Sequence, residues 1–174
     1  MKKVTRKNVI DLPYSLHDGV VTGFEVLAGS EKLNECEKQN GCETPNGCEN
    51  LNECEIPWDK LLLEFEHGFV STLEPYMQVE GKIEFAKVDW DFSFAYIIEF
   101  PDGSLCGNQG NFTGHKMELL DFIQQNKELR FEIIDETYGY NTTKLDGYLW
   151  GDTKIKECRI EIYHLGDMSY LVKN

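Results

Sequence analysis

Long apolar runs and basic residues are both scarce in this sequence of 174 residues. No stretch is long enough to span a membrane, and no run of about seven apolar residues follows the basic N-terminal residues, which argues against a cleaved signal peptide. The chain carries 17 Lys and Arg against 31 Asp and Glu, a formal net charge of −14, and shows no basic stripe. Because nucleic acids and anionic membranes are bound through clustered basic residues, we expect neither as a partner. We expect a cytoplasmic protein whose six cysteines are thiols.

Familiar catalytic motifs are missing as well. The sequence contains no G-x-S-x-G nucleophile elbow, no H-E-x-x-H zinc helix, no phosphate-binding loop that ends in Lys-Ser or Lys-Thr, and no basic-aromatic RNA motif. We therefore predict no cofactor, and no enzyme class follows from the sequence.

Apolar and aromatic residues, in contrast, are abundant enough for a folded core. Hydrophobic residues make up 41% of the chain, which contains ten Phe, eight Tyr and three Trp. A chain of this length hides on the order of 70% of its unfolded surface when it folds. We predict a single domain over residues 1–174, with one unusual insert at about residues 31–57.

The insert contains a six-residue repeat. Residues 34–57 divide into NECEKQ, NGCETP, NGCENL and NECEIP, so that a Cys-Glu pair recurs every six residues. The four repeated cysteines are Cys36, Cys42, Cys48 and Cys54. We favour a tandem duplication in a tolerant surface loop, because the segment is rich in Asn, Gly and Glu and nearly free of large apolar residues.

Two other interpretations of the repeat stay open. Six-residue periods occur in β-solenoids, although four blocks are very few for a stack that must bury a continuous core. Four thiolates would suit zinc, but the usual C-x-x-C spacing is missing and the neighbouring glutamates oppose the formation of four thiolates together. We do not predict a metal site.

The clearest secondary-structure signal is a period of two over residues 88–100. Apolar side chains occupy the even positions, and Asp89, Asp91, Ser93 and Glu99 lie on the odd side. This alternation predicts a half-buried strand whose apolar ladder faces the core. The ladder consists of Val88, Trp90, Phe92, Phe94, Tyr96, Ile98 and Phe100. The apolar phase is odd at Ile83 and Phe85, so a bulge or tight turn is expected across Ala86 and Lys87.

Similar patterns predict six further strands and one helix. The helix is expected over Gly114 to Asn126, where apolar residues recur at helical spacing. The fold class is therefore mainly β, an antiparallel sheet in a sandwich or partly open barrel with one amphipathic helix packed on it. The strands are expected at about Val20 to Leu27, Lys60 to Glu66, Glu128 to Asp135, Lys144 to Trp150, Ile155 to His164 and Ser169 to Val172.

His17-Asp18 is the strongest single candidate for chemistry, because an imidazole beside a carboxylate can transfer protons. Asp18-Gly19 is also a favoured turn dipeptide directly before the strand at Val20, and we prefer this structural interpretation. His164 shares a strand face with Cys158, but six residues of strand separate them by roughly 20 Å, so they cannot act as a nucleophile and its base. We expect a hydrogen-bonded histidine there.

The segment from Leu12 to Asp18 reads LPYSLHD and precedes apolar strands that begin near Val20 and Leu61. This pattern resembles uncharacterised small β-rich proteins of Gram-positive bacteria, over about the first 70 residues without the insert. Some such proteins lie beside toxin genes. The resemblance implies a bacterial cytoplasmic origin and no established activity.

Two functions follow as hypotheses. The preferred one is a non-catalytic protein-binding module, of the immunity type, that sequesters a basic partner; it rests on the acidic balance and the missing catalytic motifs. The alternative is a small hydrolase or ligand-binding enzyme that uses His17 and Asp18 near an aromatic pocket that includes Trp90 or Trp150. The oligomeric state does not follow from the sequence.

Overall fold

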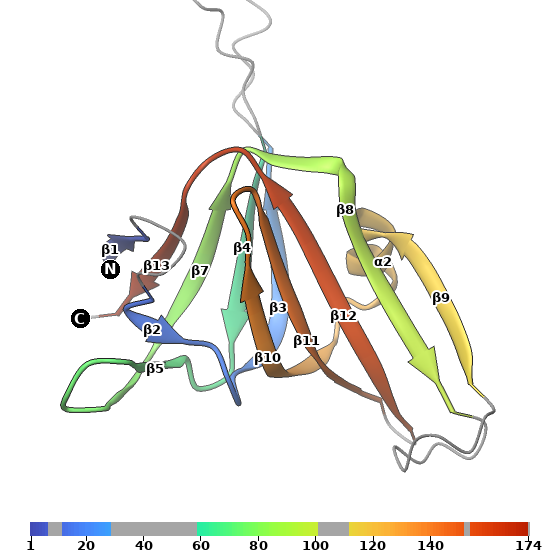
Figure 1. Ribbon diagram of the computed structural model, residues 1–174, viewed down its shortest axis with the longest axis horizontal. Helices are drawn as coiled ribbons and strands as arrows, with labels where there is room; N and C mark the ends of the chain where they lie inside the picture. The colour runs from blue at the N-terminus through green and yellow to red at the C-terminus, as the bar shows by residue number, and fades with distance from the viewer. Residues whose placement is uncertain (7–11, 29–58, 101–111, 152–153, 174) are drawn as a thin grey trace, which may run out of the picture.

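The computed structural model describes residues 1–6, 12–28, 59–100, 112–151 and 154–173, and these form strands with one short helix (Figure 1). This confirms the mainly β fold class. The elements are β1 (Lys2–Thr5), β2 (Tyr14–Ser15), β3 (Val20–Leu27), β4 (Lys60–Phe65), β5 (Phe69–Ser71), β6 (Gln78–Val79), β7 (Gly81–Ala86), β8 (Val88–Glu99), β9 (Thr113–Glu118), α2 (Leu119–Gln125), β10 (Arg130–Tyr138), β11 (Thr142–Trp150), β12 (Ile155–His164) and β13 (Met168–Val172).

Ten strands form one sheet in the order β1-β13-β7-β4-β3-β10-β11-β12-β8-β9, and every neighbouring pair is antiparallel. The sheet is not closed into a barrel, so β1 and β9 are its edges. Only two residue pairs, Phe131↔Val21 and Glu132↔Val20, join β10 to β3. The sheet therefore has two halves of five strands that share a narrow seam.

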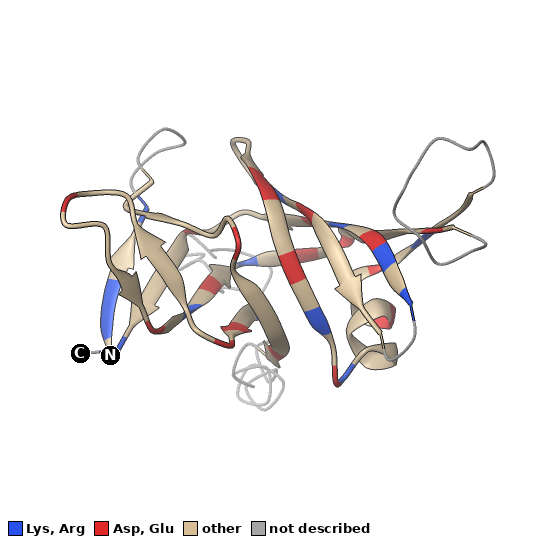
Figure 2. Cartoon of the chain, turned by 90° about the horizontal axis from the view of Figure 1, so that it is seen from below, with Lys and Arg blue, Asp and Glu red and all other residues tan. Residues whose placement is uncertain are grey.

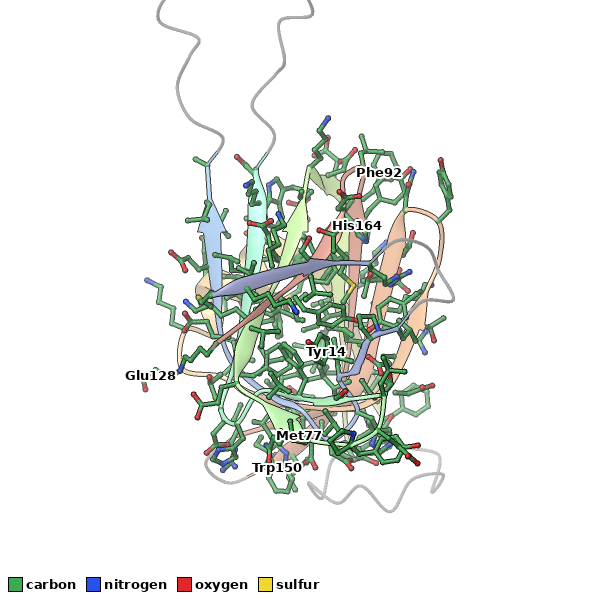
Figure 3. The ribbon with its side chains drawn as sticks, turned by 90° about the vertical axis from the view of Figure 1, so that its left-hand side faces the viewer. Tyr14, Met77, Phe92, Glu128, Trp150 and His164 are labelled. Carbon is green, nitrogen blue, oxygen red and sulfur yellow. The ribbon has the colours of Figure 1, made fainter. Side chains whose placement is uncertain are left out.

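One face of the sheet encloses the core, which a second small sheet and the helix complete. Strands β2, β5 and β6 form the small sheet. Its Tyr14 and Phe69 rings pack on each other and on Tyr170 of β13, with centroids 5.0 to 5.4 Å apart. In Figure 3 Tyr14 lies in the interior of the molecule. Helix α2 buries Leu119 and Phe122 in the same core, where it packs on β8, β9 and β12.

The predicted insert lies in the sequence between β3 and β4, which are neighbours in the sheet. These strands pair from Val21↔Phe65 to Leu27↔Lys60, so the chain departs and returns at adjacent positions. The repeat with its four cysteines lies outside the described residues. The hairpin ladder is thus complete without any contribution from the repeat.

All seven predicted strands are present. The bounds of β3 and β12 agree with the prediction, whereas β10 runs three residues further, to Tyr138, and β11 begins two residues earlier, at Thr142. The expected irregularity between β7 and β8 is confirmed, because Lys87 separates them with a φ of 57°. Strands β1, β2, β5, β6, β7 and β9 were not predicted: β1, β2, β5 and β6 have four residues or fewer and carry no clear period, and most of β9 was assigned to the predicted helix.

The predicted ladder of β8 is wrong for its second half. Ser93, Ala95 and Ile97, on the odd side, are the buried residues, whereas Phe92 is exposed and Phe94, Tyr96 and Ile98 are only half-buried. The pairing between β12 and β8 shifts in register between Glu161 and Tyr163, so the strand changes face along its length. Val88 and Trp90 do contact the core, as predicted.

The predicted helix is correct only over its second half. Thr113–Glu118 is the edge strand β9, which pairs with β8 from Glu99↔Thr113 to Phe94↔Glu118. Pairing with a neighbouring strand has overridden the local helical pattern, and the helix begins at Leu119. Within the described residues, no helix combines the length and apolar character needed to cross a membrane.

Candidate functional site

The side of β10, β11, β12, β8 and β9 that faces away from the core is here called the outer face. Side chains alternate along a strand, so the neighbours of buried residues point to the opposite side. Ile97, Leu149 and Cys158 are buried, which directs Tyr96, Tyr148 and Arg159 to the outer face. Figure 2 shows acidic and basic residues interspersed on the strands. The outer face therefore combines aromatic rings with charges of both signs.

Strand register arranges these side chains in two parallel rows. The first row consists of Asp146, Arg159, Tyr96 and Lys116. The second row consists of Tyr148, Glu157, Ile98 and Gly114. The backbone between the rows is the floor of a groove of about 620 Å³, which is lined by residues of β8, β9, β10, β11 and β12. Phe112, His115, Ile134 and Asp135 also line it.

A bulge in β10 brings two of these lining residues to the groove. The pairing of β10 with β11 shifts in register between Ile133 and Asp135. At this point β10 lies so close to β11 that a Cβ atom at Gly147 would be 1.8 Å from the carbonyl oxygen of Glu132. Glycine is therefore required at position 147, and the bulge turns Ile134 and Asp135 toward the groove.

The two cations of the first row are already engaged. The Nε atom of Arg159 donates a hydrogen bond of 2.5 Å to Oδ1 of Asp146, which holds the pKa of the guanidinium above its usual value. The Nζ atom of Lys116 lies 3.6 Å from the centroid of the Phe94 ring and 5.5 Å from that of Tyr96. Lys116 thus lies folded back over the aromatic residues of β8 in a cation–π contact.

Two carboxylates of the groove form no ion pair with a cation of the described residues. Within the described part of the chain, no Lys, Arg or His nitrogen forms an ion pair with Glu157 or Asp135, whereas Glu161 and Glu99 pair with Lys144 and Lys156. Asp135 accepts a hydrogen bond from the backbone N–H of Glu136. The groove therefore offers negative charge beside the Tyr148 and Tyr96 rings, an arrangement suited to a cationic side chain.

His17 and Asp18 lie in an exposed turn outside the groove. Gly19 N–H donates to the Leu16 carbonyl at 2.8 Å, and Asp18 N–H donates to the Ile133 carbonyl at 2.8 Å, with Asp18 at a φ of 62°. The turn is the structural role preferred from the sequence. His17 Nδ1 lies 3.0 Å from Asp18 Oδ1, and both side chains are exposed. The backbone of this turn bonds to β10, and neither side chain lines the groove.

Trp90 and Trp150 do not come together around His17. Trp90 packs on the core, and its indole N–H donates to Asp59 at 2.8 Å. Trp150 is exposed, and its indole N–H donates to Glu132 at 2.9 Å. In Figure 3 Trp150 and Phe92 lie at opposite ends of the molecule. Phe92 is two residues from Trp90 in the sequence. Neither Trp lines the groove.

The two groups best suited to nucleophilic or proton-transfer chemistry are buried. Burial, with a smaller contribution from the charge of Asp146, raises the pKa of the Cys158 thiol to about 12, so it stays protonated near neutral pH. His164 Nδ1 donates to the Gly166 carbonyl at 2.8 Å, so Nε2 accepts the hydrogen bond from Thr143 at 3.2 Å. Burial lowers the pKa of His164. The hydrogen-bonded histidine expected at this strand end is confirmed.

The described residues contain no cluster of side chains that could bind a metal ion. No group of three or more His, Cys, Asp or Glu side chains in that part of the chain is arranged to hold an ion. Cys36, Cys42, Cys48 and Cys54 lie outside it.

The groove residues were missed because the aromatic ladder was assigned to the core. The odd side of residues 88–100 holds Ala95 and Ile97 besides its polar residues, and this apolar pair was the available signal that the strand changes face. Chemically, the groove can bind a cation and stack apolar groups, and the Cys158 thiol beneath it is buried. Comparisons with protein-family models, with curated proteins and with solved structures found no match to this chain.

Proposed function

We propose that this chain is a non-catalytic protein-binding module that holds a basic segment of a partner in the groove of the outer face. The observation that carries the proposal is the pair of carboxylates, Glu157 and Asp135, beside Tyr96 and Tyr148 in a groove of about 620 Å³. A Lys or Arg side chain of the partner would meet the carboxylates and stack on the rings.

The composition of the outer face supports recognition of a protein. Tyr, Trp and Arg are the residues that most often contribute large binding energies at protein interfaces. The outer face presents Tyr96, Tyr148, Trp150 and Arg159 on paired strands of one sheet. Strands hold these side chains in place, so little conformational entropy remains to be lost on binding.

The charge of the chain supports a basic partner. A net charge of −14 attracts a cationic protein over long range and accelerates its association at low ionic strength. A module of this kind acts by covering its partner, as an immunity-type protein does. We do not prefer the enzyme alternative, because His17 and Asp18 are exposed and lie outside the groove.

The test is co-purification of a partner with a tagged chain from native cells, followed by charge reversal in the groove. Glu157→Lys should weaken the complex at least tenfold, because it places a cation where the partner's cation binds. Glu128→Lys is the matched control, since Glu128 is exposed before β10 and does not line the groove. Raising the salt concentration should weaken the wild-type complex.

Three results would count against the proposal. One is the absence of any stable partner, and the second is a partner without a basic surface. The third is an equal loss of affinity in Glu157→Lys and Glu128→Lys, which would show that only the overall charge matters. Circular dichroism of each variant checks that the fold is retained.

A further inference from the structure

Gly114 leaves a gap in the side chains that border the groove at the edge of the sheet. It lies on β9, the edge strand at the right of Figure 1, where it pairs with Ile98. Residues two positions apart along a strand point to the same side, so Phe112 and Lys116 flank Gly114 on the outer face. All three residues line the groove. The gap between Phe112 and Lys116 is here called the notch.

The backbone does not require glycine at position 114. A Cβ atom there would have no atom of the described residues within 4 Å, whereas every other glycine in that part of the chain has a neighbour within this distance. The φ of Gly114 lies outside the positive range that favours glycine, and β8 pairs with β9 over residues 113–118 without a register shift. Gly147, in the floor of the same groove, differs because the Glu132 carbonyl excludes a side chain.

The notch is wide enough for an extended polypeptide. Phe112 and Lys116 are four residues apart, which separates their Cα atoms by about 13 Å at about 3.3 Å per residue. An extended chain needs about 5 Å beside its neighbour in a sheet. Glycine weakens a strand, and where neither a bulge nor a turn accounts for it, it commonly marks a place where a ligand or another backbone approaches closely.

The two ends of the groove differ. At the β10 end, Ile134 and Asp135 lie at the bulge and border the groove. Toward the β9 end, the side chains of the second row become smaller, from Tyr148 through Ile98 to Gly114. A chain that lies along the groove therefore meets side chains at β10 and open space at β9.

We infer that the occupant of the groove is an extended segment of the partner, which crosses the strands and leaves over β9 through the notch. The inference rests on the proposed function, because it takes Glu157 as the site of the partner's cation. Register places Glu157 beside Ile98 and Ile98 beside Gly114. Two strand spacings are about 10 Å, or about three extended residues, so the partner's Lys or Arg lies about three residues from the exit. Gly114 then determines specificity, since a side chain there would exclude segments that continue beyond the edge.

Selection from a phage-displayed library of random linear dodecapeptides on the purified chain tests the inference, with fluorescence anisotropy of one selected peptide as the measure of affinity. We expect the wild type to select peptides that contain Lys or Arg. Gly114→Trp should weaken the selected peptide at least tenfold, because the indole fills the notch. Gly114→Val should give a smaller loss, and Gly114→Ala should bind like the wild type. Thr113→Trp is the matched control, because Thr113 is exposed on the same strand and does not line the groove.

Binding by Gly114→Trp at wild-type strength, together with weak binding by Glu157→Lys, would overturn the inference and leave the proposed function intact. Equal losses in Gly114→Trp and Thr113→Trp would also overturn it, since the effect would then come from the strand and not from the notch. A wild-type selection without Lys or Arg would contradict the proposed function and the inference together. Urea unfolding checks the fold of each variant, and we expect Gly114→Trp to keep its stability, because aromatic residues are favoured over glycine in strands.

Discussion

The two faces of the same five strands differ in what they bury. On the inner face of β8, β11 and β12, Ile97, Leu145 and Ile160 are buried in the core. On the outer face, Tyr96 and Tyr148 are half-buried around a groove. Two tyrosine rings thus lie on the side that the core does not use. We attribute stability to the inward residues and propose recognition for the outward ones, so substitutions of adjacent residues can separate the two effects.

Ile97 and Ile98 give the sharpest test of this contrast, because they are identical residues on opposite faces. Ile97→Ala should lower the free energy of unfolding by about 2 to 5 kcal/mol, since it leaves a cavity in the core. Ile98→Ala should cost less than about 1 kcal/mol, because its side chain faces the groove. Urea unfolding measures both, and equal losses would break the distinction between the faces.

Glu136 and Asp135 form a second adjacent pair. Glu136 accepts hydrogen bonds from the Ser15 hydroxyl at 2.8 Å, the Leu16 N–H at 3.0 Å and the Tyr138 hydroxyl at 2.6 Å. Burial, followed by the charges of Tyr170 and Glu136, raises the pKa of Tyr138, so its hydroxyl remains a donor.

Removing these acceptors by Glu136→Ala should cost about 2 to 3 kcal/mol, because three donors lose their partner. Asp135→Ala should cost less than about 1 kcal/mol and weaken partner binding instead. The measurements are thermal unfolding and affinity for the co-purified partner. A stable Glu136→Ala variant would show that this carboxylate does not fasten β2 to β10.

His164, on the inner face, makes the stability of the fold depend on pH. Burial lowers its pKa from the ordinary value of 6.5, with opposing effects from the Gly166 carbonyl, which raises it, and Arg6, which lowers it further. The unfolded chain therefore binds the proton more readily than the folded chain. Stability is fully present above the unfolded pKa and is lost as pH falls below it, by at most about 1.4 kcal/mol per pH unit for this group.

The stability of the wild type should thus decrease between about pH 7.5 and 5.5. His164→Gln, which does not titrate in this range, should show a flatter profile even though it is less stable at neutral pH. Chemical unfolding at several pH values measures both slopes. Identical slopes would mean that another group is responsible.

Deletion of the repeat should have the smallest effect. Replacing residues 34–55 by a short Gly-Ser link should shift the melting temperature by only a few degrees, since Leu27 and Lys60 are already paired across the hairpin. Differential scanning calorimetry provides the measurement. Loss of the cooperative transition would show that the repeat contributes to the fold, and the inner face would no longer account for stability by itself.

The strands were predictable from the sequence, but their faces were not. Alternation identifies an extended segment, and it gave β3 and β12 with their exact bounds. It cannot decide which side is buried when both sides carry apolar residues, as Ala95 and Ile97 oppose Tyr96 and Ile98 on β8. Partner strands and α2 decide that, and they are distant in sequence. The start of the helix was misjudged for the same reason, because pairing with β8 determines the conformation of residues 113–118.

The candidate site was less predictable still. His17 and Asp18 stand out because they are adjacent in sequence, whereas the groove joins Tyr96, Tyr148 and Glu157 from three strands. Only strand register brings these residues into rows. No local pattern in the sequence reveals that register, so the groove can be recognised only in the folded structure.

The most direct test of the outer face is site-specific photocrosslinking in native cells. A photoreactive phenylalanine at position 148 should capture a protein through a Lys- or Arg-rich peptide, whereas the same residue at position 128 should capture none. Crosslinking at position 128 alone, or capture at position 148 of a peptide without basic residues, would contradict the assignment of recognition to this face.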